Sequence, residues 1–437
     1  MAPSGEEMRL LAGDRAVTKM PPAQTGCEKR CQTSNLTDSR LPAMSISPFI
    51  AAHDNNPDWR TALNHCLEQL TRAAKTNAGA EPVAEYTLGW CYLTDPFADA
   101  AEAILAELRQ HLPGVSWVGT VGIGIAASGV EYIDEPALAL MLAPLPRASF
   151  KLFSGRQPLP MTPEAGEFHA HTALVHADGT TPDLQELLPE LAERTATGYL
   201  FGGLSSARTH TLQIADAVLT GGLSGVAFAE DVGLLSRVTQ GCQPMGPARR
   251  VTRAEDNTVL TLDGKPALAC VLEDMGLAND LAVEDMAEAL SSALVGLCRN
   301  TDDQASTPAR FGPDTLVRHI VGLDPRARVL AIGDEVEIGS QLTFCRRDPD
   351  AALLDLRRIA TEIRDELGSS RQRAVGAIYV SCIGRGGPHF GAKNAELQAI
   401  HDVLGELPLA GFFANGEIAR DRLYGYTGVL TVFTTPA

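Results

Sequence analysis

A glycine-rich segment between an apolar strand pattern and a helix pattern carries the residues best suited to chemistry. It reads SCIGRGGPHFG and spans residues 381–391. Glycines at such a turn let backbone N–H groups approach a ligand closely, and a helix N-terminus attracts anions. Arg385 adds a guanidinium suited to a carboxylate or phosphate. We predict a ligand site containing Cys382, Gly384, Arg385 and Gly386, with a purely structural turn as the alternative.

Cys382 and His389 share this segment and could form a nucleophile with its base. A cysteine beside a helix start can have a lowered pKa, and a nearby histidine could activate it. The sequence identifies neither a third member of a triad nor an oxyanion hole, and a packed thiol at a strand end is the simpler explanation. We therefore expect binding rather than catalysis, with a cysteine-dependent hydrolase or transferase using Cys382 as an alternative.

Two further segments offer polar groups to the same ligand. Asn415 and Glu417 lie in an NGEI segment after an apolar strand and could hydrogen-bond an ammonium or hydroxyl group, although Asn-Gly also forms plain hairpin turns. Arg347 and Asp348 precede a helix pattern. Arg347 could reach a ligand; alternatively, Asp348 caps the helix and the arginine is solvated.

Weaker candidates come from two small-residue turns and a group of histidines. Gly241 lies in QGCQPMGP, which could line a pocket between two halves of the chain or simply link them. Ser205 lies in GGLSSAR, which lacks the G-x-S-x-G pattern of a nucleophile elbow and predicts a pocket wall or a turn. His169 and His171 would share one face of a strand, but no cysteine or acid has a convincing spacing to them. We expect no metal and no cofactor.

An internal repeat is the main clue to the elements that position these residues. Each copy has an apolar strand, a loop, an amphipathic helix, a second strand ending near a glycine, and a later apolar strand. The copies begin at TLGWCYLTD, at TALVHADG and at AIYVSCIG, which contains Cys382.

These patterns predict an α/β protein of two domains, with mixed sheets covered by helices and built partly from repeated strand–helix–strand–strand units. We place one domain at 44–246 and the other at 247–437. Residues 1–43 are polar and aperiodic, which predicts a disordered extension or a mis-assigned start. Helix patterns include residues 59–75, 284–299 and 351–367, and Asp263-Gly264 predicts a hairpin within the second domain.

Composition restricts the class of partner. The chain has 437 residues and a formal charge of −18, so nucleic acid and anionic membrane surfaces are not expected to bind it. Its 9 cysteines are mostly isolated in apolar runs, which favours a reducing, cytoplasmic location over a disulfide framework.

Several phrases in order resemble the FIST family, named for F-box and intracellular signal transduction proteins. They are TQGCQPMGP, TLDGKPAL, RRDPDAALLDLRR, VSCIGRG, GFFANGEIA and YGYTG, and the resemblance covers roughly residues 48–430. It implies an N-terminal and a C-terminal FIST domain that sense a small ligand, such as an amino acid or a related metabolite anion. The output would pass through a separate partner protein. A protein-interaction scaffold without a ligand is a further alternative.

Overall fold

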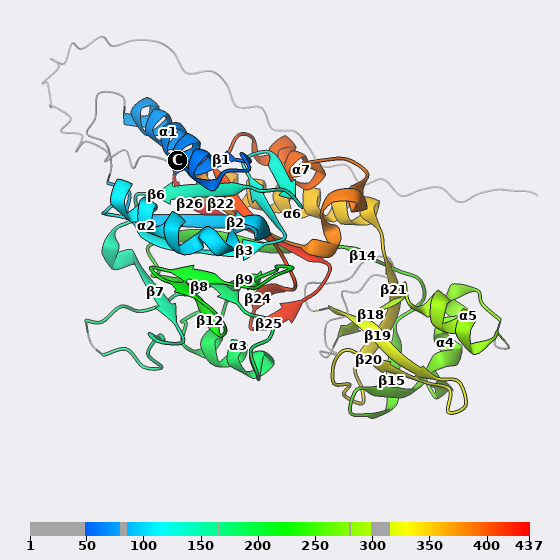
Figure 1. Cartoon of the computed structure of the whole chain (residues 1–437). Helices are drawn as coiled ribbons and strands as arrows, with labels where there is room; N and C mark the ends of the chain where they lie inside the picture. The colour runs from blue at the N-terminus through cyan, green and yellow to red at the C-terminus, as the bar shows by residue number, and fades with distance from the viewer. Residues whose placement is uncertain (1–48, 79–84, 165, 279–280, 299–314) are drawn as a thin grey trace, which may run out of the picture. The chain divides into compact units, whose positions relative to one another are not determined.

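Three six-stranded sheets, each built mainly from one of the repeated segments, form the body of the protein (Figure 1). The computed structural model describes residues 49–78, 85–164, 166–278, 281–298 and 315–437. The predicted extension at 1–43 lies outside the described residues. Within them, the prediction of a mixed α/β protein is confirmed.

The three sheets share one strand order, in which the third and fourth strands are parallel and all other neighbours are antiparallel. The first sheet contains, in order, β1 (Ile50–Asp54), β6 (Leu138–Ala143), β2 (Leu88–Thr94), β3 (Ser116–Gly122), β10 (Gln213–Ala215) and β11 (Val218–Leu219). The second contains β7 (Phe150–Ser154), β12 (Leu223–Phe228), β8 (Thr172–Ala177), β9 (Leu200–Leu204), β24 (Glu417–Arg420) and β25 (Arg422–Tyr424). The third contains β13 (Gly233–Gln240), β26 (Thr427–Pro436), β22 (Gln372–Cys382), β23 (Leu409–Ala414), β4 (Gly124–Ala127) and β5 (Val130–Ile133).

The hairpin of each repeat completes the sheet of another repeat. Hairpin β10–β11 of the second copy pairs with β3 of the first. Hairpin β24–β25 of the third copy pairs with β9 of the second, and β4–β5 of the first copy pairs with β23 of the third. Strands from both predicted domains therefore share two of the three sheets.

One glycine recurs at the same register position in each pair of parallel strands. A Cβ atom built on it would lie within 1.9 Å of the carbonyl oxygen of the residue paired with it, so only glycine fits. The three pairs are Gly119 with Cys91, Gly202 with Val175, and Gly411 with Tyr379.

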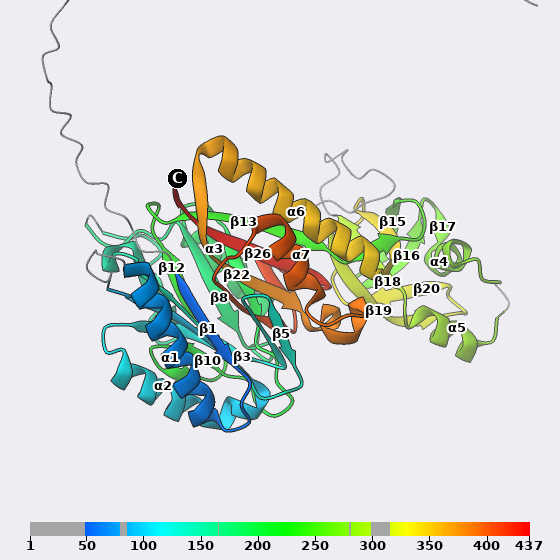
Figure 2. The same ribbon diagram turned by 90° about the horizontal axis from the view of Figure 1, so that it is seen from above.

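Helices cover the outer faces of the sheets, as Figures 1 and 2 show for α1 and α2 over the first sheet and for α6 and α7 over the third. Their apolar stripes pack on the strands, and α3 does the same on the second sheet. The predicted helices at 59–75 and 351–367 are both present. The helices are α1 (Trp59–Ala78), η1 (Asp95–Ala100), α2 (Ala101–His111), η2 (Arg147–Ser149), α3 (Leu184–Glu193), α6 (Pro349–Ser370), η3 (Ile383–Arg385), η4 (Gly387–Phe390) and α7 (Ala395–Leu404).

The inner faces of the three sheets share a single aromatic core. Tyr92 and His176, which come from the first and second sheets, meet there: the tyrosine OH lies 3.2 Å from His176 Nε2. Both rings contact Phe412 of the third sheet. His176 is fully buried, and its Nδ1 has no hydrogen-bond partner among the described residues.

Replacing His176 with glutamine should remove part of the acid sensitivity of the fold. Burial lowers the pKa of His176 to about 3, from an ordinary value of 6.5. The unfolded chain therefore binds this proton more readily, and stability falls as the pH drops below 6.5, by about 1.4 kcal/mol per pH unit. Between pH 7 and pH 5 the wild type should lose about 2 kcal/mol more unfolding free energy than His176→Gln, measured by urea denaturation. Equal losses in both proteins would contradict this role.

A second group of strands forms a ring with its own apolar core, flanked by α4 (Ala267–Met275) and α5 (Val283–Leu290). Pairing of β18 with β21 closes six of these strands on themselves. The strands are β14 (Cys242–Pro244), β15 (Arg249–Glu255), β16 (Thr258–Leu262), β17 (Lys265–Pro266), β18 (Leu294–Cys298), β19 (Leu316–Asp324), β20 (Val329–Ile332) and β21 (Gln341–Arg347). The predicted domain boundary at 246/247 falls between β14 and β15, which both pair with β21.

In this region one prediction was wrong and another is confirmed. The helix expected at 284–299 ends at Leu290, and residues 294–298 form β18, because this short apolar run pairs with strands on both sides. The hairpin at Asp263-Gly264 is present, but its second arm is only two residues long and leads directly into α4. Within the part of the chain that the structure describes, every helix is too short or too polar to cross a bilayer.

Candidate functional site

The turns after β22 and β23 open onto one cavity of about 420 Å³. Cys382 and Gly384 line it from the first turn, and Asn415 and Gly416 from the second. Strands β19 and β21 of the ring and the turn between β25 and β26 complete the walls. We call this cavity the Arg347 pocket, after the charged side chain at the end of β21. Its volume is within the range of small-molecule sites.

Tyr426 connects the ring with the body at this pocket. Its backbone has φ +59°, a conformation that bulky residues rarely adopt and that is often found at functional sites. Its OH lies 2.7 Å from Nε2 of His319, and the guanidinium of Arg347 lies 5.2 Å from its ring centroid. Sequence analysis missed both Tyr426 and His319. The YGYTG phrase, with an aromatic residue between glycines, was the available signal.

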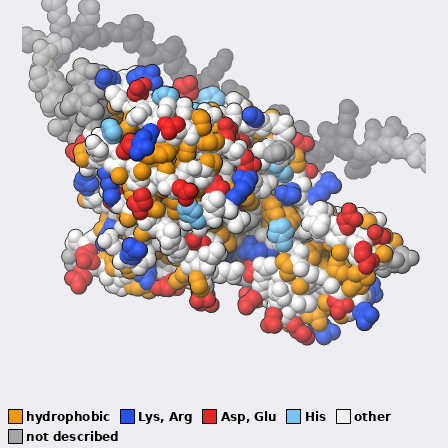
Figure 3. Space-filling model, in the orientation of Figure 1, with side chains coloured by type: hydrophobic (Ala, Val, Ile, Leu, Met, Phe, Trp, Pro, Cys, Tyr) orange, Lys and Arg blue, Asp and Glu red, His pale blue; other side chains and the backbone are white. Residues whose placement is uncertain are grey.

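The cations of the pocket differ in whether a carboxylate neutralises them. Arg318 donates from Nε to Asp334 at 2.8 Å. Arg347 is exposed and has no carboxylate partner among the described residues; it makes only a long 3.5 Å contact with the Gly384 carbonyl oxygen besides the tyrosine ring. Figure 3 shows basic and histidine side chains together in the hollow between β24–β25 and the ring strands. Arg347 is therefore the cation available to an anionic ligand.

Arg385, the predicted ligand cation, points instead into the protein. Its side chain is 1% exposed, and Nε and Nη2 donate to one carboxylate oxygen of Glu396 at 3.0 and 2.8 Å. The same carboxylate accepts hydrogen bonds from the hydroxyl groups of Tyr379 and Ser381, both at 2.7 Å. In this conformation the guanidinium links the turn after β22 to Glu396 of α7 and does not face the pocket.

Cys382 lines the pocket but is largely buried, and the fully buried Glu417 lies beside it beneath the floor. The backbone N–H groups of Gly384 and Tyr426 point to the thiol, but burial and then the nearby Glu417 carboxylate raise the pKa of Cys382 far above its ordinary value. Burial also raises the pKa of Glu417 to about 8, despite hydrogen bonds from Thr427 at 3.0 Å (N–H) and 2.7 Å (hydroxyl). Near neutral pH both groups are therefore mostly protonated, which does not suit a thiolate nucleophile.

The remaining predicted residues lie around the pocket without lining it. Asp348 caps α6 by accepting a hydrogen bond from the Ala351 N–H at 2.8 Å, as one reading of the sequence expected. Gly241 packs against the Tyr426 carbonyl, Gly386 against Ile133 and Phe413, and Ser205 lies 2.6 Å from the Thr120 hydroxyl inside the protein. His389 is half-buried in η4, and burial lowers its pKa. A ligand-binding role for these residues stays a prediction.

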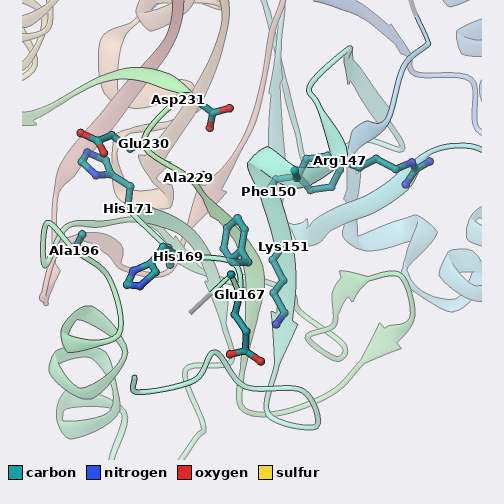
Figure 4. A pocket seen from close by; sticks show the side chains of 14 residues that line it. Arg147, Phe150, Lys151, Glu167, His169, His171, Ala196, Ala229, Glu230 and Asp231 are labelled. Carbon is teal, nitrogen blue, oxygen red and sulfur yellow. The ribbon is translucent and has the colours of Figure 1, made fainter. Parts of the chain in front are cut away.

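A larger cavity of about 1080 Å³ lies beside β7 and contains His169 and His171. Figure 4 shows their imidazoles projecting separately rather than converging on one point, with His171 beside Glu230. Among the described residues, no three histidine, cysteine or acidic side chains are placed to hold a metal ion.

Comparisons with known proteins identify the family that this sequence matches. Residues 87–265 match the model of the FIST N domain, and residues 267–420 match that of the FIST C domain. An uncharacterized protein of Mycobacterium tuberculosis is 32% identical over 408 residues, covering 86% of this chain and 97% of the relative. An uncharacterized protein of Mycobacterium bovis is 30% identical over 402 residues, covering 86% and 96% respectively.

Proposed function

Because this chain belongs to the FIST family, we propose that it is a small-ligand-binding sensory protein of intracellular signal transduction, with the Arg347 pocket as its binding site. FIST domains are regarded as sensory modules, which supports binding over catalysis. The signal would pass to a separate partner in the cytoplasm.

The observation that carries the proposal is the meeting of two turns of the third repeat on one cavity. The turns after β22 and β23 end parallel neighbouring strands, and loops at the carboxyl ends of such strands are common binding places. An uncompensated guanidinium, a tyrosine and a histidine line the same space. These polar groups favour a ligand site over a scaffold, which would present a closed, apolar cleft.

The Arg347→Gln variant should lose its response to the ligand while staying folded. In a thermal-shift screen of organic acids, amino acids and nucleotides, one class of compound should stabilise the wild type. At 100 times the dissociation constant the gain is about 2.7 kcal/mol, which corresponds to about 3 °C for a protein of this size. The variant should show at most about half of that shift, because the loss of a charge-assisted hydrogen bond weakens binding at least about 10-fold.

Arg346→Gln is the matched control for this experiment. Arg346 is exposed on the same strand, and its side chain makes a long 3.4 Å contact with Gln243. Its replacement should leave the shift unchanged. If no compound stabilises the folded wild type, or if both variants respond equally, the proposed site is wrong.

The alternative of a cysteine-dependent enzyme makes the opposite prediction for Cys382. Since burial raises the pKa of this thiol, iodoacetamide at pH 7.5 should label it at least about 10-fold more slowly in the native protein than in urea. Peptide mass spectrometry separates it from the other cysteines, and Cys298, which is only partly buried, provides an internal comparison of accessibility. Faster labelling of native Cys382 would favour the enzyme.

A further inference from the structure

The charges around the Arg347 pocket restrict the chemistry of its ligand. The whole chain has 54 acidic and 36 basic residues, yet none of the described residues that line this pocket is Asp or Glu. Two arginines and a histidine line it instead. A pocket with this lining attracts anions although the protein as a whole is strongly acidic.

The nearby carboxylates are already engaged. Asp334 holds Arg318 at 2.8 Å, and Asp348 caps α6. Glu417 is the closest acid beneath the floor, but it is 0% exposed and one of its oxygens binds Thr427. An ammonium group in the pocket would therefore lose its hydration without gaining an anionic partner, which is unfavourable.

The available positive charge equals that of one guanidinium. Arg318 is neutralised by Asp334, so among the described lining residues Arg347 is the one arginine that faces a ligand with an unpaired charge. One guanidinium can hold one carboxylate through two parallel hydrogen bonds, whereas a phosphate dianion would keep an uncompensated charge. The ring of Tyr426 and the side chains of Val317, Ile383 and Leu423 supply an apolar wall for the rest of the molecule.

We infer that the ligand of the Arg347 pocket is a small monocarboxylate with an apolar body and no ammonium group. Its carboxylate binds the guanidinium of Arg347, and its body lies against Tyr426 and the apolar wall. This inference rests on the proposed function and narrows it, because it excludes zwitterionic amino acids.

The test measures calorimetric binding of the full chain to two series of probes, in which each series keeps one apolar body. The first is 3-phenylpropanoate, phenylalanine, 2-phenylethylamine and 2-phenylethyl phosphate. The second is hexanoate, norleucine, pentylamine and pentyl phosphate. We expect one of the two acids to bind at least about 10-fold more tightly than the other members of its series.

Variants locate the binding at Arg347. Arg347→Gln should weaken the acid at least about 10-fold, Arg347→Lys should weaken it less, and Arg346→Gln should leave it unchanged. Equal or tighter binding of an amino acid, amine or phosphate overturns the inference, as does binding of neither acid. If another class of compound then stabilises the protein through Arg347, the proposed function stands without this inference; if nothing binds, both fail.

Discussion

Replacing Glu396 with glutamine is expected to lower the free energy of unfolding by about 3–5 kcal/mol. The change is nearly isosteric but removes the carboxylate of Glu396, which is bonded to Arg385, whose side chain is 1% exposed. The guanidinium would remain charged, because an arginine does not lose its proton in a protein. An uncompensated buried charge is among the most destabilising changes a single substitution can cause. Chemical denaturation at pH 7 measures the loss.

Two comparisons make this result specific. Asp365→Asn removes an exposed ion-pair partner of Arg364, and such pairs contribute at most about 1 kcal/mol. The double variant Arg385→Met/Glu396→Leu should recover much of the lost stability, because apolar replacement of both partners is often tolerated. A loss below about 1 kcal/mol in Glu396→Gln would show that Arg385 has other partners and would return it to the candidates for ligand binding.

Alanine at Gly202 should prevent folding or lower the unfolding free energy by more than about 4 kcal/mol. The added Cβ would lie 1.9 Å from the Val175 carbonyl oxygen, at a backbone φ of +139°. The Val175 carbonyl group and the pairing of β8 with β9 cannot shift without disturbing the core on the inner face of the sheet. Circular dichroism and urea denaturation of purified protein measure the effect, and Gly411→Ala should behave in the same way because its Cβ would lie 1.8 Å from the Tyr379 carbonyl oxygen.

Gly368→Ala is the matched control, because it adds the same methyl group where no other atom is close. Gly368 lies in α6 with nothing within 4 Å of the added atom, and alanine favours a helix by up to about 1 kcal/mol over glycine. This variant should match or exceed the wild type in stability. If Gly202→Ala also keeps wild-type stability, Gly202 does not approach the Val175 carbonyl as closely as the structure shows.

The repeated units were accessible from the sequence because each copy contains its own apolar strands, helix and glycine. Local periodicity predicts such elements well, as the helices α1 and α6 show. The exchange of hairpins was not accessible, since the β-strand pattern of β4 or β24 contains no information about which open edge it will join. The prediction of a helix over 284–299 failed beyond Leu290 because a short apolar run fits a helix and a buried strand equally well.

The sequence predicted the two turns that line the candidate site, but it did not predict the residues of the other walls. The glycines and the NGEI phrase marked two segments that do line one cavity. The partner of Arg385 was hidden because Glu396 follows in a helix whose sequence looks amphipathic and solvated. His319 comes from a segment with an ordinary strand pattern and Tyr426 from a turn between glycines, and only tertiary contact brings them to Arg347.

Because the hairpins pair with the sheets of other repeats, neither half of this chain would contain all the strands of its own sheets. A piece ending at Gly246 would leave β9 without β24, and β4–β5 without the strand it borders. In the complementary piece β23 would lack β4 and β26 would lack β13, while β22 would still pair with both strands. Bare strand edges pair readily with other chains, so either half alone would tend to aggregate, and the two should be productive only when made together.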